Sequence, residues 1–245
     1  MTNKLTIAAF LACLLAVGVG AQKKLKPWAE WSKKDAEKIL NDSGWGQTQV
    51  ETDTSELFFQ PTAPPTASGG VNAGQRNTEG ATNQAVNVKY RVRFFSARPI
   101  RMALVRLIEL EMKSPNLQAS EGLKKFAEAQ SPDSIIVTVA FETNDQRYGG
   151  RLLQAFNSAE TSTTKNNSYL ERRDGKRLFL QEYVKPGKDG FGARFIFPRT
   201  LDGQPFLTPE SGEVRFHGEN VGRNLFMADR RFKVSEMMYD GALEY

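Results

Sequence analysis

The side-chain chemistry open to this chain is limited by its supply of histidine and cysteine. His217 is the only histidine and Cys13 the only cysteine among 245 residues. A Ser–His–Asp arrangement would have to use His217, and a zinc site would find no second histidine to share the ion. His217 ends the alternating stretch Val214–His217, which predicts a strand histidine that is half buried or faces solvent. The sequence therefore identifies no catalytic residue, no metal ligand and no cofactor-binding residue, and we expect no cofactor.

Two arginines form the one group of residues that could hold a ligand. Arg98 and Arg101 lie at the start of an expected helix, directly after an expected strand. Backbone N–H groups at a helix N-terminus, together with nearby arginines, can bind an anion. We therefore treat Arg98 and Arg101 as candidate anion-binding residues. The alternative is that both face water or pair with carboxylates such as Glu109 and Glu111.

Acidic residues leave a second function open. Asp and Glu total 28, so a two-carboxylate hydrolase acting on envelope glycans or lipids is the alternative to a binding protein. No spacing singles out a carboxylate pair. The glycine-containing stretch Asp189–Gly192 lacks the strand-to-helix context of a phosphate loop, and we expect residues 187–190 to be a turn.

The first 21 residues have the pattern of a secretory signal peptide. Lys4 gives a basic head, Leu5–Val19 is an uncharged apolar run, and Val19-Gly20-Ala21 offers small or compact residues for cleavage. The run is shorter than the roughly 20 residues that a membrane-spanning helix needs. We therefore expect residues 1–21 to be removed and the mature chain to be periplasmic or secreted.

Removal of the signal would leave a mature chain without cysteine. Leu11-Ala12-Cys13 resembles a lipoprotein cleavage box, but we expect an ordinary cysteine within the apolar stretch. Many small secreted domains depend on disulfides, whereas this one must be held together by packing.

The charge pattern narrows the class of partner. The formal net charge is +5, and the Lys and Arg residues are dispersed among Asp and Glu. A nucleic-acid-binding protein usually concentrates its basic residues on one face or tract. We expect the partner to be an envelope protein or surface, and not a nucleic acid.

The tryptophans mark the N-terminal segment as a docking element. Trp28, Trp31 and Trp45 are the only three, and they flank a predicted helix that begins after Ser32. Its apolar stripe consists of Ala36, Ile39 and Leu40. A helix of about ten residues is too short to be stable alone in water. We therefore predict that the three tryptophans anchor this segment to the main domain.

The rest of the chain predicts an α+β fold. Alternating or apolar runs predict strands, and stripes at helical spacing predict helices. The expected strands are 47–59, 86–95, 135–141, 168–173, 176–184, 193–197, 213–217 and 232–238, and the expected helices are 98–113, 120–129 and 148–159. We expect a mainly antiparallel sheet with two or three packed helices and the N-terminal Trp-bearing helix.

A polar segment interrupts this pattern at residues 60–85, and we predict that it is disordered. Two interpretations remain open, an interdomain linker and a long hairpin tip. Strand patterns on both sides favour the hairpin tip. Residues 22–245 would then form a single domain.

Two segments resemble a known group of proteins. Pro27–Ser43, which reads P-W-A-E-W-S-K-K-D-A-E-K-I-L-N-D-S, and Tyr90–Arg101 are similar to segments of a family of uncharacterised secreted proteins from soil bacteria. The resemblance covers most of the mature chain. It implies an exported or envelope location and carries no known catalytic residues. With the observations above, it leads us to expect a non-enzymatic binding or interaction protein of the envelope.

Overall fold

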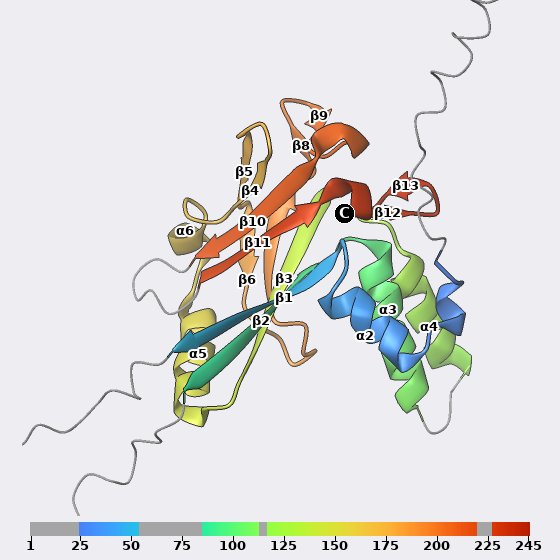
Figure 1. Cartoon of the computed structure of the whole chain (residues 1–245), viewed down its shortest axis with the longest axis horizontal. Coiled ribbons are helices and arrows are strands. Elements are labelled where there is room, and N and C mark those ends of the chain that lie inside the picture. The colour runs from blue at the N-terminus through green and yellow to red at the C-terminus, as the bar shows by residue number, and fades with distance from the viewer. Residues whose placement is uncertain (1–24, 54–84, 113–116, 220–226) are drawn as a thin grey trace, which may run out of the picture.

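The protein has an α+β fold built on antiparallel sheets (Figure 1). The computed structural model describes residues 25–53, 85–112, 117–219 and 227–245. The predicted signal peptide, and the predicted disordered segment except for Ala85, lie outside these residues. None of the described helices combines the length and apolar character that crossing a bilayer requires.

The larger sheet has the strand order β1-β2-β3-β7-β6. Its strands are β1 (Gly46–Asp53), β2 (Val86–Phe94), β3 (Ser134–Thr143), β6 (Glu182–Val184) and β7 (Ala193–Pro198). The apolar strand β3 lies at the centre, as its composition predicts. β1 and β2 pair antiparallel from Gly46 opposite Arg93 to Asp53 opposite Val86. Residues 54–84 therefore connect two strands that are paired neighbours.

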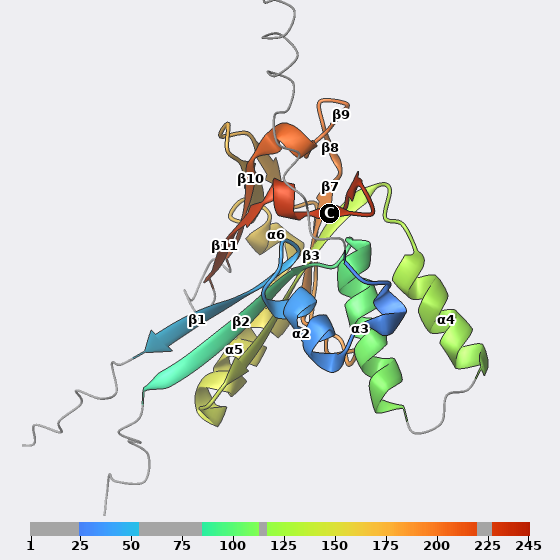
Figure 2. The same cartoon turned by 45° about the vertical axis from the view of Figure 1, so that its right-hand side comes forward.

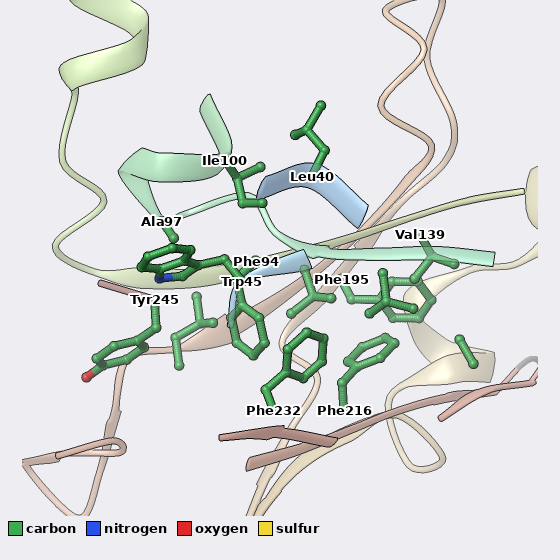
Figure 3. Close-up of a cluster of buried hydrophobic side chains, with 14 of the residues drawn as sticks. Leu40, Trp45, Phe94, Ala97, Ile100, Val139, Phe195, Phe216, Phe232 and Tyr245 are labelled. Atoms are coloured by element: carbon green, nitrogen blue, oxygen red, sulfur yellow. The ribbon is translucent and has the colours of Figure 1, made fainter. Parts of the chain in front are cut away.

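The smaller sheet has the order β11-β10-β4-β5 and packs against the larger one. Its strands are β4 (Tyr169–Arg172), β5 (Arg177–Phe179), β10 (Glu213–Glu219) and β11 (Met227–Lys233). Phe94 meets Phe232 edge-on at 5.0 Å between ring centroids, and Phe195 meets Phe216 at 5.3 Å (Figure 3). These aromatic contacts form the centre of the core between the sheets.

Two glutamine side chains join the sheets where their edges meet. The Gln47 amide donates to the carbonyl of Arg231 at 2.9 Å, and the Gln49 amide donates to that of Met227 at 3.1 Å. The Gln49 carbonyl oxygen accepts from the backbone N–H of Asp229 at 2.9 Å. Backbone groups of β11 that would be unpaired at a sheet edge are thus satisfied by side chains from β1.

The helices form two groups (Figures 1 and 2). One group lies near the C-terminus and consists of η1 (Trp28–Glu30), α2 (Lys33–Asn41), α3 (Arg98–Glu111) and α4 (Leu117–Glu128). The other consists of α5 (Gln146–Ser158) and the short α6 (Thr161–Thr164). The Asp145 carboxylate caps α5 by accepting from the backbone N–H of Tyr148 at 2.8 Å. Phe156 stacks on Phe141 and so attaches α5 to β3.

Short elements complete the C-terminal half. They are β8 (Thr200–Leu201), β9 (Gln204–Pro205), η3 (Pro209–Ser211), η4 (Val234–Glu236), β12 (Met238–Tyr239) and β13 (Ala242–Leu243). Two-residue turns with positive φ at both positions, Asp202–Gly203 and Asp240–Gly241, close the β8–β9 and β12–β13 hairpins. This is the turn geometry in which both central residues must tolerate a left-handed backbone.

Two expected strands differ from those in the structure. The stretch 176–184 was expected to be one strand, but it divides into β5 and β6, which belong to different sheets. The backbone changes partner between Leu180, which donates to Ser168, and Gln181, which donates to Ile196. The stretch 232–238 is also not one strand, because β11 ends at Lys233 and η4 follows.

The turn between β4 and β5 is not the two-residue type I′ turn that the dipeptide Asp174–Gly175 favours in a hairpin. Of these two residues only Gly175 has a positive φ, at 82°. The Gly175 N–H donates to the Arg172 carbonyl, and the Arg172 N–H donates to the Lys176 carbonyl. This is a longer loop with glycine in the left-handed position.

Candidate functional site

A groove of about 1050 Å³ lies between the α2 segment and the C-terminal hairpin β12–β13. We call it the clasp groove. One wall comes from residues near the start of the described chain and the other from residues near its end. Its lining residues are Leu25, Lys26, Trp31, Asp35, Lys38, Ile39, Asp42, Ser43, Gly44, Trp45, Glu236, Met238, Tyr239, Asp240 and Gly241.

The first wall depends on a short helix with well-defined ends. The Ser32 hydroxyl accepts from the Asp35 N–H, and the Asp35 carboxylate accepts from the Ser32 N–H at 3.0 Å, which completes a capping box. The buried stripe Ala36, Ile39 and Leu40 packs into the core. These contacts hold α2 in place and leave its polar residues along the groove.

The turn after α2 brings this wall against the C-terminal region. The Ser43 hydroxyl donates to the Ile39 carbonyl at 2.6 Å and accepts from the N–H groups of Trp45 and Gly46. A Cβ at position 44 would lie 2.3 Å from the carbonyl oxygen of Glu236. Glycine at position 44 therefore permits the backbone of the turn to contact η4.

The second wall is held by bonds between residues far apart in sequence. The Trp45 indole N–H donates to the Glu244 carbonyl at 2.9 Å, across 199 residues. The Arg98 guanidinium forms an ion pair with the Glu244 carboxylate. Arg199 donates to the Tyr245 carbonyl at 2.7 Å, and its guanidinium lies 4.0 Å from the centre of the Tyr245 ring. Residues Glu244 and Tyr245 are thus fixed to α3, to Trp45 just before β1, and to Arg199 just after β7.

Carboxylates outnumber basic side chains in the groove, although the whole chain has a formal net charge of +5. Four carboxylates line it, at Asp35, Asp42, Glu236 and Asp240, against two lysines, Lys26 and Lys38. The hydrogen bonds from Ser32 lower the pKa of Asp35, and Glu236 lies 3.1 Å from the ammonium of Lys233. Within the described residues, Asp42 and Asp240 have no side-chain hydrogen bond or ion pair. They remain available to a cationic group.

A second polar cluster lies on the face of the smaller sheet opposite the core, around His217. Its Nδ1 lies 3.1 Å from the Asp229 carboxylate, and its Nε2 lies 3.6 Å from that of Glu219. The imidazole ring stacks on Tyr169 at 4.9 Å between centroids. His217 is thus a largely buried strand histidine bracketed by two carboxylates.

Among the described residues, the surroundings of His217 do not form a hydrolytic triad. Ser168 directly precedes β4, whose Tyr169 pairs with His217, and it is fully buried with its hydroxyl accepting from the Glu219 N–H at 3.3 Å. The Asp229 carboxylate is also held by the Arg215 guanidinium. The described residues contain no group of three or more His, Cys, Asp or Glu side chains that could hold a metal ion.

The two candidate anion-binding arginines are both used by partners within the protein. Arg98 pairs with Glu244, a carboxylate that the sequence did not point to. Arg101 is only 3% exposed, and its guanidinium donates to the carbonyls of Phe95, Ser96, Phe126 and Ala129. Both guanidiniums are thus engaged by groups of the protein itself, and these contacts give the anion site no support.

The three tryptophans are all buried in the core cluster. Trp31 and Trp45 also line the clasp groove. Sequence analysis missed the wall of the groove that the β12–β13 hairpin forms, because Asp240–Gly241 indicates only a turn. Nothing local to that turn indicates that it faces α2.

Comparisons of the chain with protein-family models, curated proteins and solved structures find no match.

Proposed function

We propose that this chain is an exported protein of the bacterial envelope that binds a partner through the clasp groove and does not catalyse a reaction. The groove is the observation that carries the proposal. Its volume of about 1050 Å³ is at the upper limit of small-molecule sites, which are typically about 300–1,000 Å³. The signal-like residues 1–21 support the exported location.

Three carboxyl groups of the described residues have shifted pKa values, and none of these three suits the general acid of a hydrolase. A two-carboxylate glycosidase needs one carboxylic acid whose pKa is raised, so that it can donate a proton. The pKa is lowered in all three described carboxyl groups whose pKa departs from the ordinary value, which are Asp35, Asp174 and Asp229. For Asp174, the hydrogen bond from Arg172 lowers the pKa to about 2. These three groups are therefore poor general acids.

Site-specific photocrosslinking in cells tests this proposal. A photoreactive amino acid at Met238, which lines the groove, is compared with one at Val50, a residue that is 57% exposed and does not line it. We expect a discrete crosslinked species from position 238 only, in the envelope fraction, from a chain that begins at or near Gln22.

Two results would contradict the proposal. Retention of a full-length chain in the cytosol would remove the exported location. Equal crosslinking from both positions, or none from position 238, would show that the groove is not the binding surface.

A further inference from the structure

We propose that the clasp groove takes an extended peptide segment of a partner protein, in which lysine or arginine side chains flank an apolar side chain. This inference rests on the proposed function and names the chemistry of the partner. The size, lining and charge of the groove each contribute to it.

The shape and lining of the groove favour a peptide. The groove runs between two walls, and Leu25, one of its lining residues, is 41% exposed. Leu25, Ile39 and Met238 contribute apolar surface that could receive an aliphatic side chain. An extended segment places successive side chains on opposite sides, so it can direct apolar and charged groups to different walls.

The charge of the groove favours a cationic segment. Four carboxylates and two lysines line it, whereas the chain as a whole carries +5. Asp42 belongs to the wall that follows α2, and Asp240 belongs to the turn of the opposite hairpin. A basic residue on either side of the peptide would therefore meet a carboxylate without an ion-pair partner among the described residues. Complementary charge of this kind selects partners and accelerates association.

The turn at Asp202 offers a matched control for the Asp240 carboxylate. Asp240 and Asp202 each occupy the first position of a two-residue turn, with φ of 49° and 53°, and each precedes a glycine with positive φ. Asparagine tolerates this backbone as well as aspartate does. Asp240→Asn and Asp202→Asn therefore remove one carboxylate from equivalent turns, but only Asp240 lines the groove.

The test uses two fluorescein-labelled twelve-residue peptides with the purified protein from Gln22 to Tyr245. Both contain four leucines, and one carries four lysines where the other carries four glutamates. Fluorescence anisotropy should show that the lysine peptide binds at least about tenfold more tightly. The double variant Asp42→Asn/Asp240→Asn should lose about tenfold in affinity for it, and Asp202→Asn should lose nothing. Raising the salt concentration should weaken binding, because partly exposed charges are screened.

Three outcomes would overturn the inference. Equal binding of both peptides would indicate an occupant chosen by apolar contact alone. Equal effects of the double variant Asp42→Asn/Asp240→Asn and of Asp202→Asn would place the binding outside the groove. Self-association that competes with the peptide in sedimentation velocity would assign the groove to a second copy of the chain. If position 238 crosslinks in cells while the lysine peptide fails to bind, the proposed function stands and only the chemistry of the partner is wrong.

Discussion

At the scale of single residues, Asp229 shows how a strand carboxylate organises its surroundings. It accepts from the Arg215 Nε, at 2.9 and 3.0 Å to its two oxygens, and it lies 3.1 Å from His217 Nδ1. Burial raises its pKa, but the hydrogen bonds from Arg215 and His217 outweigh burial, so the pKa lies below its ordinary value of 3.8. A carboxyl group with a lowered pKa in the folded state stabilises the protein above its unfolded-state pKa. That stabilisation is lost as the pH falls through the folded-state value.

The variant Asp229→Asn tests this assignment. At pH 7 we expect it to lower the free energy of unfolding by about 2 kcal/mol, the scale of a hydrogen bond to a charged group. The difference from wild type should shrink as the pH falls through the lowered folded-state pKa of Asp229, because the wild-type carboxylate then becomes protonated. Urea denaturation at a series of pH values measures both effects.

The control for Asp229→Asn is Glu142→Gln. Glu142 pairs with Arg91, but its side chain is 54% exposed, and we expect a cost below about 1 kcal/mol. If Asp229→Asn changes the free energy of unfolding equally at pH 7 and at pH 2, the charge of Asp229 does not contribute to stability.

At the scale of elements, the N-terminal segment is stable only because it is docked. Trp31 is 2% exposed, its indole N–H donates to the Lys26 carbonyl at 2.9 Å, and its own carbonyl accepts from Arg106 at 2.8 Å. The same residue therefore fastens η1 and α2 to α3. A helix as short as α2 requires such tertiary support.

Truncation of this anchor should weaken the whole fold. We expect Trp31→Ala to cost about 3 kcal/mol, the scale for removing a large buried aromatic side chain. Leu25→Ala, in the same segment but at an exposed residue, should leave the urea midpoint nearly unchanged. A midpoint for Trp31→Ala that equals the wild-type value would show that the segment does not depend on this anchor.

At the scale of the whole molecule, β1 and β2 are paired neighbours although residues 54–84 separate them in the sequence. Pairing continues along both strands, and Gln47 and Gln49 tie β1 to β11 as well. Residues before 54 are therefore held by residues after 84, and the single domain stays a prediction.

A protease site engineered between residues 60 and 85 tests this unity. After cleavage we expect the two fragments to elute together in gel filtration without denaturant, because β1, α2 and Trp45 remain packed against the larger fragment. Fragments that separate under native conditions would favour the linker interpretation and contradict a single domain.

Local sequence was sufficient for the elements whose side chains repeat with a clear period. The alternation in β2, the apolar run of β3 and the stripe of α2 each predict an element close to the one observed, because each reports burial of one face. The class of fold follows from the same patterns. The predicted strand 176–184 failed because its change of sheet leaves no periodic mark in a short segment. The predicted strand 232–238 failed because β11 ends at Lys233 and the short helix η4 follows.

The sequence by itself thus determined the α+β class and most of the helices and strands. Only the tertiary structure decided where the candidate groove lies and what Arg98 and Arg101 do. Arg98 is 146 residues from its partner Glu244, and Trp45 is 199 residues from the carbonyl that it binds. No local pattern encodes such pairs, because they form only when the core between the two sheets has brought the ends of the chain together.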